Sequence, residues 1–193
     1  MAERKGCKHL LLDFFACFLI PAYTLLFAGS MQWFSTNFSV LAVTGPGHYR
    51  GFVYWGLLAG SYFFVMLSAL AFALPRRRER VLVRVLAVCA VLSLAYAVAI
   101  PYLPAYFPRY AALHVALAAG ACVLLMLALL VILLALRPTD PARWAGPLRA
   151  WGLIVLGCAI LFLIPMMVST ALEVFFTISA ALLVRRIWLL KNF

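Results

Sequence analysis

The sequence predicts an all-α membrane protein, a bundle of six transmembrane helices forming a single domain over residues 1–193. Two observations predict this fold class: the composition and the arrangement of the apolar residues. Hydrophobic residues make up 68% of the chain and charged residues 11%, whereas soluble domains are about half apolar and about a quarter charged. The apolar residues also come in long runs rather than in alternation, which is the pattern of membrane spans.

Six apolar runs predict the six spans. They cover residues 9–29, 52–74, 81–100, 111–136, 150–168 and 170–190. Each holds close to the ~20 residues that a helix needs to cross ~30 Å of hydrocarbon. Pro21 and Pro165 lie inside or near the end of a run, where proline bends or ends a helix.

Pairs of small residues four positions apart predict close helix contacts. Gly56 with Gly60 forms one such pair, and Ala116 with Gly120 forms another. Small residues let helix backbones approach closely in lipid, either within the bundle or in a homo-oligomer or a complex with another membrane protein.

The basic residues predict the orientation. All of the 16 Lys and Arg residues except Arg50 and Arg109 border the runs on one side of the membrane, both termini included. Because Lys and Arg accumulate in cytoplasmic segments, both termini are expected in the cytoplasm of a multi-pass cell-membrane protein. The Ala-, Leu- and Arg-rich composition favours a bacterial inner membrane. A net charge of +11 suggests nucleic acid in a soluble protein, but here no solvated basic domain exists to bind it.

The five cysteines predict neither a disulfide framework nor a metal site. Cys7, Cys17, Cys89, Cys122 and Cys158 include no CxxC pair. They are interpreted as small apolar packing residues. No cofactor motif appears in the sequence, and no cofactor is expected.

Apart from His9, Arg84, Arg185 and Arg186 at the borders, three ionisable side chains lie inside the predicted spans: Asp13, His114 and Glu173. Such groups cost roughly 2.5–3.5 kcal/mol at a helix centre on insertion scales, so each is a candidate functional residue. Asp13 follows His9 by four residues, which places both on one helix face. The pair is interpreted either as part of an ion pathway or as structural, with the carboxylate reaching an Arg at the membrane border.

His114 and Glu173 are predicted to lie at the outer side of the membrane, together with polar residues of the loop after the first span. Thr170-x-x-Glu173 is a capping-box pattern, so Glu173 either caps its own helix or faces a polar cavity. A lone histidine in a span commonly makes an interhelical hydrogen bond. The shared depth nonetheless predicts an outer-facing, ligand-binding pocket formed by His114, Glu173, Ser39, Asn37, His48 and Arg50.

Two chemistries are compatible with these side-chain types. His48, His114 and Glu173 are the ligand types of a two-histidine, one-carboxylate metal site, and Ser39, His114 and Glu173 are those of a nucleophilic relay. Neither set has the characteristic spacing or a nucleophile-elbow motif. The sequence therefore does not favour an enzyme.

Several landmarks resemble the DRAM-like six-helix membrane proteins and their uncharacterised bacterial relatives. The stretch Ser35-Thr36-Asn37-Phe38-Ser39-Val40 resembles their polar outer segment, and Phe107-Pro108 with Leu113-His114 resembles their proline-and-histidine landmark. Glu173 resembles their late carboxylate, whereas the acidic residue expected beside the outer-loop serine is missing. The resemblance implies a six-helix bundle in which His114 and Glu173 are family positions. Eukaryotic members include autophagy modulators and lipid-anchor remodelling proteins, so the resemblance implies no single reaction.

Three functions are compatible with these observations. The favoured one is the binding of a membrane lipid, a small amphiphile or a partner membrane protein in the outer pocket. The second is a small transporter or substrate-binding subunit in which Asp13 and Glu173 mark opposite ends of a pathway. The third is an intramembrane lipid hydrolase or transferase. The first is preferred because few polar residues are predicted at mid-membrane depth, where a transport route needs them.

Overall fold

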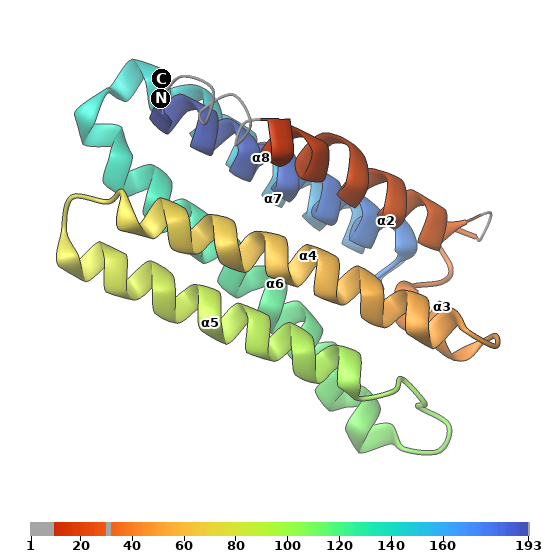
Figure 1. The fold of residues 1–193 in the computed structure, drawn as a ribbon. Coiled ribbons are helices and arrows are strands. Elements are labelled where there is room, and N and C mark those ends of the chain that lie inside the picture. The colour runs from red at the N-terminus through yellow and green to blue at the C-terminus, as the bar shows by residue number, and fades with distance from the viewer. Residues whose placement is uncertain (1–9, 30–31, 193) are drawn as a thin grey trace.

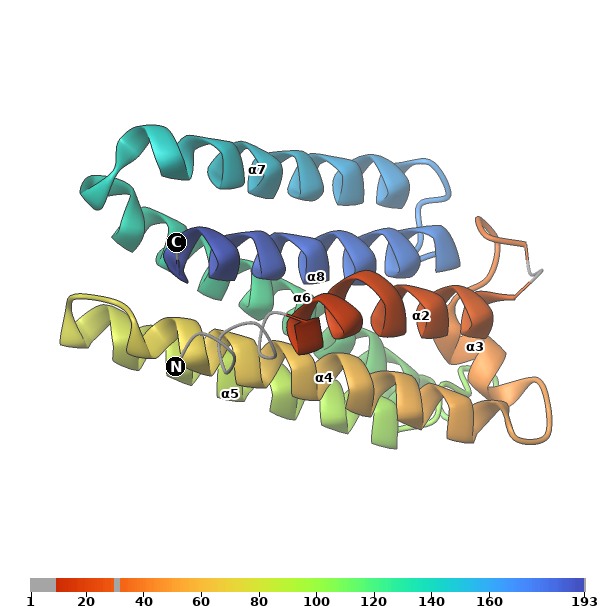
Figure 2. The same ribbon diagram turned by 45° about the horizontal axis from the view of Figure 1, so that its top comes forward.

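The computed structural model describes residues 10–29 and 32–192, and every regular element in that part of the chain is a helix. The elements are η1 (Phe14–Leu19), α2 (Ile20–Ala28), α3 (Phe38–Val43), α4 (His48–Phe72), α5 (Arg77–Ala99), α6 (Pro108–Leu136), η2 (Arg137–Thr139), α7 (Pro141–Leu163) and α8 (Thr170–Asn192). In Figure 1 and Figure 2 the long helices lie side by side. α5 packs between α4 and α6, and α8 packs against α2 and α7.

The links between helices gather at the two ends of the molecule. The links 73–76 and 137–140 lie at one end, and α3 with the links 100–107 and 164–169 lies at the other (Figure 1). The connections therefore alternate between the ends, as an antiparallel bundle requires.

Five helices are long and apolar enough to cross a membrane. They are Leu10–Ala28, His48–Phe72, Arg77–Ala99, Pro108–Thr139 and Pro141–Leu163. α8 has 23 residues, but Glu173 near its start and Arg185 near its end leave it with a shorter uncharged stretch, residues 174–184, than each of the other five helices has. The predicted all-α class with several membrane-compatible helices is thus confirmed, whereas the count of six crossings stays a prediction.

The fifth predicted span is displaced along the sequence. α7 begins at Pro141 rather than at residue 150 and ends at Leu163, before Pro165. The Asp140 carboxylate caps the helix by accepting a hydrogen bond from the Arg143 N–H at 3.0 Å, and Pro141 occupies the first turn, where no N–H is needed. The predicted span began after Arg143 and Arg149, whereas α7 includes both residues.

The first helix changes its hydrogen bonding just before Pro21. Phe14–Leu19 forms a π-helical segment, and the Ile20 N–H donates to the Phe15 carbonyl. Pro21 has no N–H to donate to the preceding turn, and wider turns of this kind accompany such interruptions. Pro21 thus perturbs the helix without ending it, since α2 runs on to Ala28.

The two predicted small-residue pairs differ in what they contact. A Cβ added to Gly56 would lie 2.9 Å from Val98 Cγ2, and one added to Gly60 would lie 3.3 Å from Leu94 Cδ2. This pair therefore brings α4 close to α5. Ala116 is exposed, and a Cβ at Gly120 would meet nothing within 4 Å. The second pair is left free on the surface of α6.

Candidate functional site

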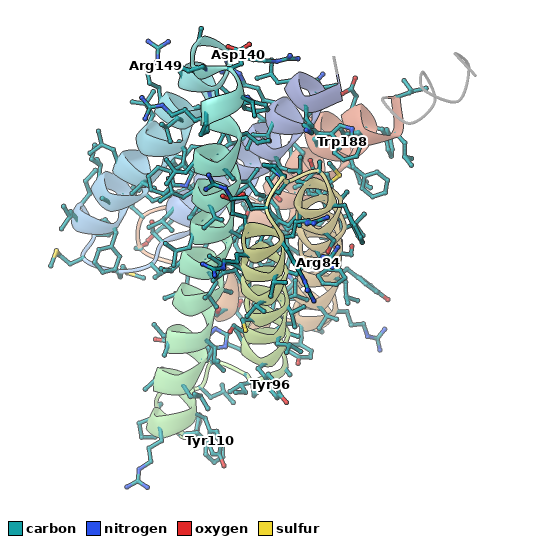
Figure 3. The ribbon with its side chains drawn as sticks, turned by 90° about the vertical axis from the view of Figure 1, so that its left-hand side faces the viewer. Arg84, Tyr96, Tyr110, Asp140, Arg149 and Trp188 are labelled. Carbon is teal, nitrogen blue, oxygen red and sulfur yellow. The ribbon has the colours of Figure 1, made fainter. Side chains whose placement is uncertain are left out.

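A cavity of about 400 Å³ lies among the long helices. α6 runs from Tyr110 toward the link at Asp140, and α7 diverges from it away from that link (Figure 3). Residues of both helices line the cavity on this side, and α4, α5 and α8 supply the remaining walls. The walls are predominantly apolar, with Phe63, Leu67, Leu125 and Phe176 among them.

Polar side chains line the cavity mainly at the end where α3 lies. Asn37, Ser39, His114 and Glu173, here called the polar cluster, all line it, together with the hydroxyl-bearing Tyr102 and Thr177. The cluster comes from three separated parts of the chain: the start of α3, the first turns of α6 and the first turn of α8.

Backbone hydrogen bonds to the start of α8 hold α3 in place. The Thr170 N–H donates to the Thr36 carbonyl at 2.7 Å, and the Ala171 N–H donates to the Trp33 carbonyl at 2.9 Å. Asn37 is the N-cap of α3: its Oδ1 accepts from the Val40 N–H at 2.9 Å, and its Nδ2 donates to the Val168 carbonyl at 3.3 Å. Phe38 is fully buried and anchors this short helix.

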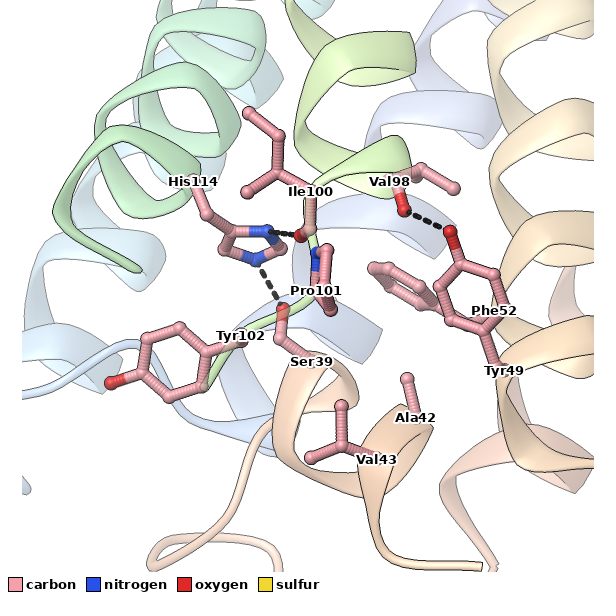
Figure 4. Close-up of a pocket in the computed structure, with 10 residues that line it drawn as sticks. All are labelled: Ser39, Ala42, Val43, Tyr49, Phe52, Val98, Ile100, Pro101, Tyr102 and His114. Carbon is pink, nitrogen blue, oxygen red and sulfur yellow. Dashed lines mark hydrogen bonds between the residues drawn. The ribbon is translucent and has the colours of Figure 1, made fainter. Parts of the chain in front are cut away.

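Ser39 and His114 form a buried polar pair. Ser39 Oγ lies 2.6 Å from His114 Nε2, and His114 Nδ1 lies 2.8 Å from the Ile100 carbonyl oxygen (Figure 4). Because a carbonyl only accepts, Nδ1 carries a proton, and in the neutral ring Nε2 then accepts from the serine hydroxyl. The two residues are 8% and 3% exposed, so the ring is held in one orientation and one tautomer.

Glu173 caps a helix, but not the one that the sequence predicted. Its Oε2 accepts a hydrogen bond from the Phe38 N–H at 2.6 Å, at the start of α3. In its own helix, Ser169 Oγ accepts from the Leu172 N–H at 3.4 Å, and the Thr170 N–H is bonded to Thr36. The capping-box interpretation is therefore wrong. Glu173 Oε1 accepts no hydrogen bond from the described residues, and the side chain lines the cavity.

The predicted convergence of His114 and Glu173 is indirect. The two side chains are bonded to adjacent residues of α3, Ser39 and Phe38, rather than to each other. Residues 37–39 thus join the carboxylate and the imidazole. A relay in which Glu173 orients His114 is not formed, because the Ile100 carbonyl takes that position.

His48 and Arg50 do not line the cavity. His48 Nδ1 donates to the Leu41 carbonyl at 3.2 Å, and Arg50 is an exposed residue of the first turn of α4. His48 is therefore separate from the other two residues of the hypothetical metal site. Among residues 10–29 and 32–192 there is no group of three His, Cys, Asp or Glu side chains placed to hold a metal ion.

Asp13 is paired at a distance from the cavity. Its Oδ1 accepts from Arg185 Nε at 2.5 Å, as the structural interpretation anticipated for a border Arg. Neither residue lines the cavity. His9, its predicted neighbour on the helix, lies outside the described residues.

The cysteines divide between the cavity and the exposed faces of the helices. Cys122 and Cys158 line the cavity, whereas Cys17 and Cys89 are exposed rather than packed in the core. Cys7 lies outside the described residues.

Two parts of the site were missed from the sequence. One is helix α3, which was predicted to be a loop. Asn37 is a residue type that commonly caps the start of a helix, and here its side chain accepts from the Val40 N–H. The other is the Ile100 carbonyl. Pro101 directly follows the end of α5, and the last carbonyls of a helix have no partner within it, so a nearby donor such as His114 was to be expected.

Comparisons with protein-family models, with curated proteins and with solved structures found no match.

Proposed function

We propose that this protein binds an amphiphile in the membrane, with the apolar chain in the cavity and the polar end at the polar cluster. One observation carries the proposal: a cavity of about 400 Å³ with apolar walls has its carboxylate and its imidazole at one end. Ligand pockets of roughly 300–1,000 Å³ with a few oriented polar groups are typical of small-molecule sites. Because residues of both α6 and α7 line the cavity, we propose that a membrane lipid enters sideways between these two helices.

The proposal places six crossings in the membrane, with α8 as the sixth. α8 is as long as α5 and α7, at 23 residues, and its Arg185, Arg186 and Lys191 lie in its last two turns, where they border the cytoplasm in the predicted orientation. Glu173 is in the first turn of α8. The polar cluster then lies in the outer half of a cell membrane, bacterial by composition, and the DRAM-like resemblance points to the same two residues, His114 and Glu173.

A transport pathway from Asp13 to Glu173 is less well supported. Asp13 is satisfied by Arg185, and only Glu173 lines the cavity. Between them along α8, Ala180, Ala181 and Val184 are fully buried in the hydrophobic core. A polar route needs side chains at mid-membrane depth, and apolar packing occupies that position here.

Photolabelling tests the binding proposal. The purified protein in lipid nanodiscs is exposed to a photoreactive single-chain amphiphile, and the labelled residues are mapped by peptide mass spectrometry. We expect labels on cavity residues of α6 and α8. The variant Ala118→Phe, which fills the cavity, is expected to lose them, whereas Ala116→Phe on the exposed face of the same helix is expected to keep them. Labels confined to exposed helix faces, unchanged by Ala118→Phe, would overturn the proposal.

A second candidate, acyl transfer, is favoured by the Ser39–His114 contact alone. A serine 2.6 Å from an imidazole whose other nitrogen is fixed has the geometry of an activated nucleophile. Ser39 Oγ would attack a lipid ester carbonyl while its proton passes to His114 Nε2. That proton would then leave with the released alcohol, and water would hydrolyse the acyl-serine. Labelling by a fluorophosphonate probe in wild type and its loss in Ser39→Ala would support this candidate, and equal labelling of both would exclude it.

A further inference from the structure

The strongly charged side chains that line the cavity are of one sign only. Among the residues that line it, Glu173 is the one acidic side chain, and no Lys or Arg is present. Arg185 lies on the same helix as Glu173, but it is bonded to Asp13 and does not line the cavity. A headgroup that enters the polar cluster therefore meets a carboxylate and no fixed positive charge.

Most hydrogen-bond donors of the cluster already have acceptors. The Phe38 N–H donates to Glu173, one N–H of Asn37 donates to Val168, and His114 Nδ1 donates to Ile100. In the neutral tautomer the Ser39 hydroxyl donates to His114 as well. The oxygen left over is Glu173 Oε1, an acceptor. The hydroxyls of Tyr102 and Thr177 can donate or accept, so they do not discriminate between headgroups.

A buried charge is stable when it is paired, and a second charge of the same sign beside it is strongly unfavourable. A phosphate or carboxylate headgroup would lie against Glu173 with few donors to compensate. An ammonium group would supply both the missing positive charge and the missing donor.

The volume limits the apolar part of the ligand. If each methylene takes up about the ~30 Å³ share of one water molecule in the liquid, a cavity of about 400 Å³ holds roughly a dozen of them. That is one alkyl chain rather than two.

From these observations we infer that the ligand class is a single-chain amphiphile with a cationic, hydrogen-bond-donating head such as a primary amine, held by Glu173 Oε1. The inference rests on the proposed function, because it specifies the headgroup of the same cavity's ligand.

A matched ligand series tests it. An alkyl primary amine, an alkyl alcohol and an alkyl phosphate of equal length, about a dozen carbons, compete with the photoreactive amphiphile in nanodiscs of uncharged lipid. We expect the amine to bind at least ~10-fold more tightly than the phosphate, with the alcohol between them. In Glu173→Gln the preference for the amine over the alcohol is expected to disappear, because the amide keeps the hydrogen bond from the Phe38 N–H but carries no negative charge.

Glu79→Gln is the control. It removes one negative charge from the first turn of α5, where Glu79 is paired with Arg76 outside the cavity, and it is expected to leave all three affinities unchanged. Equal binding of amine and phosphate in wild type, or a preference that survives in Glu173→Gln, would overturn the inference while leaving amphiphile binding intact. If none of the three compounds competes, the proposed function itself fails, and the inference with it. A melting temperature of Glu173→Gln close to that of the wild type shows that the variant is folded.

Discussion

Ser39 and His114 are joined over a sequence separation of 75 residues by a single buried hydrogen bond. Removing only one partner of such a bond is costly, because the other partner stays buried without its donor or acceptor. The polar cluster is therefore both a candidate binding surface and a set of mutually satisfied groups that holds α3 against α6 and α8.

Ser39→Ala is expected to destabilise the protein by about 1–3 kcal/mol, because it leaves His114 Nε2 buried without a donor. The free energy of unfolding is measured on the purified protein in mixed micelles, as the concentration of a denaturing detergent is increased. Ser61→Ala is the control, since the Ser61 hydroxyl is exposed and bonds only to its own helix. A double variant with His114→Ala that shows no coupling between the two sites would contradict the contact.

Asp13→Asn is expected to lower thermal stability, because the pair with Arg185 is half-buried and joins the first helix to α8. The matched control is Glu79→Gln, whose pair with Arg76 is longer, at 3.4 Å, and has a cation that is 80% exposed; a pair with so exposed a cation contributes little. We expect the larger fall in melting temperature for Asp13→Asn. A fall in melting temperature for Asp13→Asn that is no larger than the fall for Glu79→Gln would contradict a structural role for the Asp13 pair.

At this scale the sequence identified the residues but, apart from a border Arg for Asp13, not their partners. Asp13, His114 and Glu173 stood out because ionisable groups are costly in apolar helices, and each of them is hydrogen-bonded. The acceptor for His114 and the donor to Glu173 are both backbone groups, of Ile100 and Phe38. Glu173 and Phe38 are 135 positions apart, and no local pattern encodes a contact over that separation.

Helix α3 has only six residues, too few to be stable alone. It is held by its cap, by Glu173 and by the docking of residues 33–36 onto α8. The helix is therefore a product of tertiary contacts, which explains why the sequence suggested a loop there.

Asn37→Ala is expected to loosen α3, because the Val40 N–H loses its acceptor. Loss of such a cap costs about 0.5–2 kcal/mol. Amide hydrogen exchange over residues 38–43 is expected to accelerate. Thr44→Ala removes a side-chain hydrogen bond at the other end of the helix and is expected to have a smaller effect; exchange that is as slow in Asn37→Ala as in wild type would contradict the role of the cap.

The contact between α4 and α5 gives a second test at the element scale. Gly56→Leu is expected to lower the melting temperature, because even a Cβ at this position would lie 2.9 Å from Val98 Cγ2 and the helices would have to separate. Gly120→Leu makes the same change in α6, where a Cβ meets nothing within 4 Å, and it is expected to be tolerated. Equal melting temperatures for the two variants would show that the close approach is not needed.

Helix existence was predictable for the long elements because each combines an apolar run with polar borders. The residues at which the helices begin and end were less predictable. The sequence placed the start of the fifth span at residue 150, yet Asp140 and Pro141 begin α7 earlier. Composition locates the part of a helix that lies in lipid, whereas caps locate its ends.

For the whole molecule, the arrangement of links gathers most of the basic residues at one end, as the predicted orientation requires, and the orientation itself stays a prediction. The end that holds α3 and the links 100–107 and 164–169 carries few basic residues, while the opposite end carries most of them. The cavity itself was not predictable, because it depends on how α6 diverges from α7 and not on any local motif.

Sidedness can be measured with single cysteines in a variant that lacks the native ones. We expect a membrane-impermeant maleimide to label Tyr106→Cys from outside intact cells, and Thr139→Cys only after permeabilisation. A tag after residue 193 is expected to be inaccessible in intact cells, because the six proposed crossings would return the C-terminus to the cytoplasm. An externally accessible tag would show five crossings and would remove α8 from the membrane.

The most direct measurement is an experimental structure of the protein in lipid nanodiscs. We expect elongated density for a single chain between α6 and α8, with its polar end beside Glu173, Ser39 and His114. A bundle in which side chains close the cavity, or in which water alone fills it, would contradict amphiphile binding at this site.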